Sequence, residues 1–273
     1  MSLLGRITSI QSAEPITENS AAMQPYKVFT SNKLKIIAAI AMFFDHFVTV
    51  FLPHNEMLSL VFRFFGRMAA PIYCFFIAEG FNFTSNLKKY ISRLCILAII
   101  AHLPYNLCFG FSFFQATSVA LPLAMGLIAL AVVKNEKIIG IARLGIVALC
   151  CAISYRANWN YVAVLWILAF GIFHRNLKPQ IISFCAIGVV FHLIPAFIRF
   201  GFFHERFPQW FQLGIFLSIP FFIMFSGKQG KKSAFMSSFF YVFYPGHLIL
   251  LYLLKHFTPL AGILGGLLLK RPG

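Results

Sequence analysis

Apolar residues run along most of the chain in long stretches, and short basic segments separate them. Nine of these stretches are long enough for helices that approach the roughly 20 residues needed to cross a bilayer. A tenth stretch, over 260–269, is shorter and fits a further span, a re-entrant piece or an interfacial helix. We therefore predict an all-α, polytopic integral membrane bundle of about nine to ten transmembrane helices, over 34–52, 58–83, 91–111, 119–133, 138–153, 161–173, 181–198, 211–225 and 234–254.

Composition also indicates a bilayer as the solvent. Hydrophobic residues make up 60% of the 273-residue chain and charged residues only 11%, whereas a soluble domain is nearer one quarter charged. The six cysteines lie in or beside apolar runs without metal-type spacing, so we expect neither a metal site nor a disulfide framework. No linker divides the chain. This predicts a flexible polar tail over 1–30 and a single transmembrane domain over 31–273.

The net charge of +16 is distributed as a topology signal, because the cations lie between the apolar runs and form no single basic face. Most of them fall in alternate connections: Lys27, Lys33, Lys35, Lys88, Lys89, Arg93, Lys134, Lys137, Arg143, Arg175, Lys178, Lys228, Lys231 and Lys232. The positive-inside rule predicts that this side, with the N-terminus, is cytoplasmic. We expect no nucleic-acid partner.

Ionisable side chains inside a span are costly and usually functional. The chain has only seven acidic residues, so each one within a span is informative. The candidates within the predicted spans are Asp45, His46, Glu79, His102, His192 and His247. For His102 and His192, taken alone, a hydrogen-bonded core histidine is the simpler interpretation.

Asp45 and His46 are adjacent near the middle of the first span. On a helix their side chains point about 100° apart, so one can line a cavity while the other bonds a neighbouring helix. The carboxylate can still raise the basicity of the imidazole through space. The alternative is that both only hold helices together by hydrogen bonds. A carboxylate beside the histidine favours catalysis, with Asp45 orienting His46.

Lys35 and His46 lie on the same helix face, because eleven residues make about three turns and place them roughly 16 Å apart along the axis. Lys35 would then stand at the cytoplasmic surface and His46 at mid-membrane. Coenzyme A fits this geometry: its phosphates would meet Lys33 and Lys35, and its pantetheine arm would carry a thioester towards His46. The spacing fits equally well with Lys35 as a topology anchor.

Arg63 and Arg67 are one helical turn apart at the outer end of the second span. They could steady an anionic or carbonyl oxygen, or mark the membrane interface. Glu79, at the other end of the same span, has Arg93 as a candidate partner.

Residues 244–247 read Tyr-Pro-Gly-His inside the last long span. The Pro-Gly step is expected to break the backbone ladder, which is tolerated where protein or a watery cavity receives the freed groups. His247 is therefore a candidate second site histidine. A kink without chemistry is the alternative.

Four sequence blocks follow one another between about residues 33 and 255. They are Lys35-IIAAIAMFF-Asp45-His46, Gly66-Arg67-MAA-Pro71-IYCFFIA-Glu79-Gly80-Phe81, Arg93-LCILAIIA-His102-L-Pro104 and SFF-YVF-Tyr244-PG-His247. In this order they resemble the TraX family of membrane proteins, known for acetylating the N-terminus of conjugative pilin. Through that family the chain resembles the wider group of membrane acyltransferases that includes the type-3 acyltransferases.

The resemblance implies acetyl-CoA, or another acyl-CoA, as a donor on the cytoplasmic side of a bacterial inner membrane. It implies His46 as general base and Lys35 as a donor-binding residue. The full set of candidates is Asp45, His46 and His247 for catalysis, Lys33, Lys35 and Arg93 for the donor, and Arg67, Glu79 and Tyr244 for substrate and oxyanion contacts. Residues 158–161 depart from the family pattern, which leaves the acceptor open.

We therefore expect a membrane-embedded acyltransferase, and more narrowly an acetyltransferase. It would move an acyl group from acyl-CoA to an amine or hydroxyl of a membrane or periplasmic acceptor, such as a pilin N-terminus. Two other functions fit the same residues. A proton-coupled transporter would use the buried Asp, Glu and His as a relay, and a non-catalytic pilus or secretion assembly factor would not need Lys35 or His46.

Overall fold

The computed structural model describes residues 27–204, 208–231 and 234–257. This part of the chain forms helices, and its only other regular pairings are isolated bridges from Phe29 to Phe225 and from Thr117 to Ala157, so the predicted all-α class is confirmed. The elements are α1 (Ser31–Phe51), α2 (Met57–Gly66), α3 (Ala69–Phe83), α4 (Leu87–Phe109), α5 (Ala120–Val133), α6 (Gly140–Ile153), α7 (Asn160–Ile172), α8 (Leu177–Gly188), the π-helix η2 (Val189–Leu193), α9 (Ile194–Phe200), the 3-10 helix η3 (Trp210–Leu217), α10 (Ser218–Ile223) and α11 (Ala234–Phe257).

Five helical stretches of the described chain are long and apolar enough to cross a membrane: Ser31–Phe51, Met57–Phe83, Leu87–Phe109, Leu177–Phe200 and Ser238–Phe257. They make this a multi-pass membrane protein and imply a lipid bilayer around it. Shorter apolar helices occupy Ala120–Val133, Gly140–Ile153, Asn160–Ile172 and Trp210–Ile223.

These nine stretches follow the order of the nine predicted spans with ends within four residues of the prediction, and the four shorter ones are short for a membrane crossing. The 14 residues of α5 make a helix of about 21 Å, which is shorter than the roughly 30 Å hydrocarbon core. The predicted stretch 260–269 and most of the predicted tail lie outside the described residues. Phe29, at the end of that tail, is paired: its N–H donates to the Met224 carbonyl at 3.1 Å.

The stretch Met57–Phe83 is interrupted between α2 and α3, at Arg67 and Met68. Pro71 explains the interruption, because in a continuous helix its ring would clash with the Arg67 carbonyl and it has no N–H to donate there. In the first turn of α3 a backbone N–H would have no partner within the helix, so proline costs no hydrogen bond there. The break lies beside α1, at the level of Asp45.

The break expected at the Pro-Gly step of residues 245–246 does not occur. Helix α11 runs without interruption from Ala234 to Phe257 with Pro245 inside it. Proline there removes one N–H from the ladder, and the neighbouring turns keep the helix intact.

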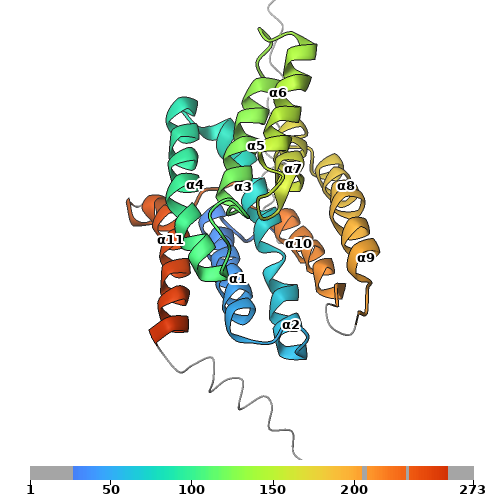
Figure 1. Cartoon of the computed structure of the whole chain (residues 1–273). Coiled ribbons are helices and arrows are strands. Elements are labelled where there is room, and N and C mark those ends of the chain that lie inside the picture. Colours follow the sequence, from blue (N-terminus) through green and yellow to red (C-terminus); the bar gives the residue numbers. More distant parts are fainter. Residues whose placement is uncertain (1–26, 205–207, 232–233, 258–273) are drawn as a thin grey trace, which may run out of the picture.

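The bundle centres on α3, α5 and α7, with α1, α4 and α11 on one side and α8 to α10 on the other (Figure 1). Aromatic side chains fill this centre. The ring centroids of Phe75 and Phe170 are 5.4 Å apart, edge to face, and the Trp166 Nε1–H donates to the Phe184 carbonyl at 3.2 Å. Apolar side chains on the outer helices, such as Ile99, Ile141 and Ile198, are largely exposed, as expected of surfaces that face lipid.

Gly214 sets how closely η3 approaches α2. A Cβ atom at this position would lie 1.8 Å from the Phe64 carbonyl oxygen, and a backbone atom cannot move aside. Gly214→Ala is therefore expected to force the two elements apart and to destabilise the protein by about 1–3 kcal/mol. Thermal unfolding of the purified protein in detergent measures this effect.

Gly145→Ala is the matched control, because no atom lies within 4 Å of the added Cβ in α6. It should leave the unfolding temperature unchanged or raise it slightly. Equal unfolding temperatures for the two variants would contradict the close approach of η3 and α2.

Candidate functional site

Two buried histidines from opposite ends of the chain form the centre of the site. The His46 Nδ1 of α1 and the His247 Nε2 of α11 are 2.8 Å apart, and the two ring planes are nearly parallel, at 12°, with centroids 5.1 Å apart. Both side chains are nearly inaccessible to solvent. The structure thus joins the two strongest histidine candidates of the sequence, which are 201 residues apart.

Hydrogen-bond geometry assigns the protons of this pair. The His247 Nδ1 lies 2.9 Å from the Phe243 carbonyl oxygen, which can only accept, so this nitrogen must carry the proton. In a neutral His247 the Nε2 then has a lone pair and accepts from the Nδ1–H of His46. The Nε2 of His46 is consequently the nitrogen with the free lone pair, as a general base requires.

Asp45 does not orient His46, and this part of the prediction is wrong. The Asp45 carboxylate binds the Arg67 Nη2, with distances of 3.0 Å to Oδ2 and 3.2 Å to Oδ1. Neighbouring side chains on a helix diverge by about 100°. His46 therefore contacts α11, whereas Asp45 contacts the break between α2 and α3. The role of orienting His46 passes to His247.

Tight packing holds the Asp45–Arg67 pair in place. A Cβ atom on Gly66 would lie 2.3 Å from the Cβ of Asp45, so only glycine admits the carboxylate here. The Arg67 guanidinium lies 5.2 Å from the ring centroid of Trp159 and 5.3 Å from that of Phe211. Since its charge is already paired, Arg67 is a poor candidate for the oxyanion contact predicted from the sequence.

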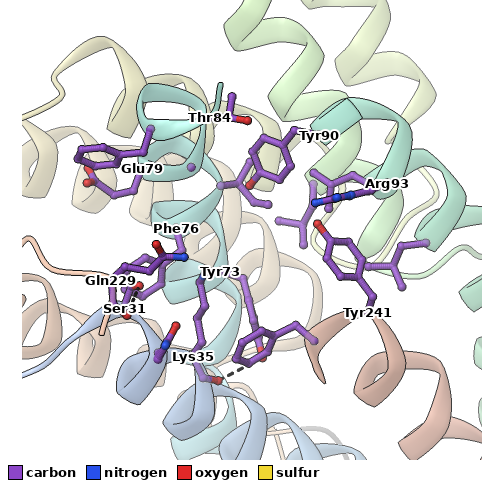
Figure 2. Close-up of a pocket in the computed structure, with 18 of the residues that line it drawn as sticks. Ser31, Lys35, Tyr73, Phe76, Glu79, Thr84, Tyr90, Arg93, Gln229 and Tyr241 are labelled. Atoms are coloured by element: carbon purple, nitrogen blue, oxygen red, sulfur yellow. Dashed lines mark hydrogen bonds between the residues drawn. The ribbon is translucent and has the colours of Figure 1, made fainter. Parts of the chain in front are cut away.

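A cavity of about 880 Å³ opens beside α1, α3, α4 and α11 (Figure 2). Basic side chains line it, and they come from segments far apart in the sequence: Lys35, Lys89, Arg93 and Lys231. The Lys35 ammonium lies 5.3 Å from the ring centroid of Phe76 and 5.7 Å from that of Phe240. Lys33, by contrast, is exposed and does not line the cavity. We call the end of the bundle that holds this cavity the basic end.

The remaining sequence candidates lie around this cavity. Arg93 of α4 and Tyr241 of α11 point towards each other (Figure 2). Glu79 lines the cavity but pairs with His174, at 3.3 Å, and the suggested Glu79–Arg93 pair is not formed. Tyr244 is buried in the cavity wall, and its ring centroid is 5.5 Å from that of His247.

A second, much smaller cavity of about 20 Å³ lies beyond the first, next to His46. A space of this size holds about one water molecule. Met42, Tyr73 and Val119 line both cavities, so these side chains form the partition between the large cavity and His46. Lys35 and His46 therefore open into different compartments on one face of α1, about 16 Å apart along the axis.

The sequence analysis missed several residues of the site. Lys89 and Lys231 were interpreted only as topology signals, and Tyr73 carried no signal because it lies in an apolar run. Trp159 was also missed. Its backbone is left-handed, with φ of 65°, which is unusual for a bulky residue and is typical of functional positions. The nearest signal in the sequence was the departure of residues 158–161 from the family pattern.

His102 and His192 have the structural roles expected of them. The His102 Nε2 bonds the Phe113 carbonyl at 2.8 Å. The His192 ring stacks on Trp159, with centroids 4.8 Å apart, and its Nε2 lies 3.0 Å from the Gln212 Oε1. Within the described part of the chain, no group of three or more His, Cys, Asp or Glu side chains is placed to hold a metal ion.

The model of a protein family described as "TraX protein" matches residues 30–255. The chain belongs to the TraX family. The match begins at Thr30, which caps α1 by accepting a hydrogen bond from the Lys33 N–H, and it ends in the last turn of α11. The histidine pair, the Asp45–Arg67 pair and both cavities therefore lie within the region that matches the TraX family.

This TraX-family chain is also similar to a protein of Dichelobacter nodosus named "Probable fimbrial assembly protein FimC, serogroup H1". The two are 30% identical over 247 residues, which cover 84% of this chain and 97% of the relative. No solved structure matches the chain.

Proposed function

We propose that this protein is a membrane-embedded acyltransferase. It takes an acyl group from acyl-CoA held in the basic cavity and transfers it, with His46 as general base, to an amine or hydroxyl. The observation that carries this proposal is the buried His46–His247 pair, which lies just beyond the floor of a basic cavity and leaves the Nε2 of His46 with a free lone pair.

The basic cavity has the shape and charge for a CoA-type donor. A volume of about 880 Å³ lies in the range of small-molecule and cofactor sites. Lys35, Lys89, Arg93 and Lys231 line it, and phosphates of the donor would bind to these cations. The narrow pantetheine arm would follow the face of α1 inward from Lys35. Movement of Met42 or Tyr73 would then admit the thioester to His46.

The transfer step uses the free nitrogen of His46. The Nε2 removes a proton from the acceptor amine or hydroxyl as the acceptor atom attacks the thioester carbonyl. The carbon–sulfur bond of the resulting tetrahedral intermediate then breaks, and the His46 imidazolium returns the proton to the departing CoA thiolate. His247 keeps the His46 ring in the required tautomer and orientation, through its own bond to the Phe243 carbonyl.

Tyr73 is the side chain best placed to stabilise the developing oxyanion. It lines both cavities, and its hydroxyl makes only a long bond of 3.4 Å to the Lys35 carbonyl. A hydroxyl held so loosely can turn to a thioester oxygen without breaking a strong interaction.

The TraX family and the name of the relative support a role for this activity in pilus biogenesis. We infer that the acceptor is a pilin or another exported protein, that the basic end faces the cytoplasm of a bacterial inner membrane, and that the donor is acetyl-CoA. The space beside His46 supports a small acyl group, because a cavity of about 20 Å³ leaves no room for a long chain without rearrangement.

Lys35→Ala should weaken binding of radiolabelled acetyl-CoA to the purified protein about tenfold, the loss expected when one charge-assisted contact is removed. Equilibrium dialysis in detergent measures the dissociation constant. Lys33→Ala is the matched control, since Lys33 lies two residues away, is exposed and does not line the cavity. If the two variants bind the donor equally well, the cavity is not the donor site.

The name of the D. nodosus relative favours a second candidate function, that of a fimbrial assembly factor without catalysis. In that case replacing Lys35 or His46 would leave pilus assembly unchanged in cells that depend on this protein. Loss of acylated pilin together with intact pilin export supports the acyltransferase instead.

A further inference from the structure

Arg63 carries a half-buried charge for which the described residues offer no partner. It lies in the last turn of α2, with its guanidinium 4.0 Å from the ring centroid of the fully buried Phe211. The ion pairs within the described residues are Asp45–Arg67 and Glu79–His174, and neither includes Arg63. Its Nε is buried without a hydrogen-bond partner.

The charges around Arg63 do not balance. Arg63 and Arg67 are one helical turn apart and interact electrostatically with each other and with Asp45. The Asp45 carboxylate is already bound through both oxygens by Arg67. One positive charge therefore remains in partly apolar surroundings. Such a charge is costly unless an anion joins it.

His54, an exposed side chain in the loop between α1 and α2, is close enough to Arg63 to interact with its charge. Partial burial lowers the pKa of His54, and the nearby positive charge of Arg63 lowers it further. The imidazole is therefore mostly neutral at pH 7, so it adds no competing charge and can present an N–H.

We propose that Arg63 binds an oxyanion, with the His54 imidazole as a second donor, beside α2 and the loop between α1 and α2. The ligand is a phosphate or carboxylate group, because a guanidinium matches the geometry of both. Two sources present this chemistry: the headgroup of a phospholipid, and a free anionic ligand. The site uses none of the residues of the acyl-transfer proposal and does not depend on it.

Residue-specific chemical protection tests the site. The purified protein, in a maltoside detergent free of phosphate, is treated with phenylglyoxal, and modification of each arginine is followed by peptide mass spectrometry. Inorganic phosphate at ten times its dissociation constant should slow modification of Arg63 about tenfold relative to chloride of equal ionic strength. Arg199, an exposed arginine whose guanidinium lies 5.1 Å from the ring centroid of Phe200, is the internal control and should react at the same rate in both salts.

Repeating the reaction in phosphatidylglycerol nanodiscs distinguishes the sources. Protection of Arg63 in nanodiscs without added phosphate identifies a lipid headgroup, and protection only by added phosphate identifies a free anion. Equal modification rates under all three conditions would overturn the proposal. So would slow modification in chloride that Glu205→Gln relieves, since an acidic side chain of the chain itself would then be the partner.

A second measurement covers the case in which Arg63 does not react. In a Lys35→Ala background, which weakens anion binding at the basic cavity, phosphate should raise the unfolding temperature of the protein. Adding Arg63→Gln should abolish this rise, and adding Arg199→Gln should not. A rise that survives Arg63→Gln, or no rise in the Lys35→Ala protein, contradicts the site.

Discussion

Replacing His46 with alanine is expected to stop CoA release from acetyl-CoA while leaving donor binding within about twofold of wild type. The reason is that Lys35, which we propose to bind the donor, lies about 16 Å from His46 along α1, and that His46 does not line the basic cavity. Loss of a positioned general base costs roughly 10²–10⁴ in rate. Single-turnover release of CoA from purified protein, with a pilin peptide or another amine as acceptor, measures the effect.

Two controls separate chemistry from folding in this experiment. His46→Asn keeps a side-chain amide that can donate to the His247 Nε2 but has no basic nitrogen, so it should fold and remain inactive. His102→Ala removes a histidine that only bonds the Phe113 carbonyl, and should retain most activity. A folded His46→Asn protein that releases CoA at the wild-type rate would rule out His46 as the base.

Arg67→Met is expected to destabilise the protein by about 3–5 kcal/mol, because it leaves the Asp45 carboxylate buried and unpaired. Both partners are only slightly exposed, at 13% for the Arg67 side chain and 11% for that of Asp45, so water can replace little of the lost interaction. Asp45→Asn should also be strongly destabilising, since it leaves Arg67 beside Arg63 without a carboxylate. Unfolding in nanodiscs or mixed micelles measures both variants.

The double variant Asp45→Asn/Arg67→Met decides whether the pair acts as a unit. It should be more stable than the sum of the single changes predicts, since neither member of the pair then leaves the charge of the other without its partner. Additive effects of the two substitutions would show that the ion pair contributes no coupling, and that Asp45 and Arg67 are held by their other contacts.

The pattern of the sequence was enough to predict the helices and the side chains worth testing. Uninterrupted apolar runs can satisfy their backbone groups in a bilayer only as helices, so the all-α class followed without a tertiary structure. Helical periodicity also placed Lys35 and His46 on one face of α1. His46, Asp45 and His247 were selected because ionisable side chains at mid-span cost free energy to bury and are usually kept for function.

Only the tertiary structure decided which of these side chains meet. Periodicity sets directions within one helix, whereas contacts between helices depend on how their surfaces pack. For this reason Asp45 pairs with Arg67, which Gly66 and the break before Pro71 bring to it. His46 pairs with His247, 201 residues away. The basic cavity likewise exists only where α1, α3, α4 and α11 converge, and their packing brings together cations that in the sequence resemble topology signals.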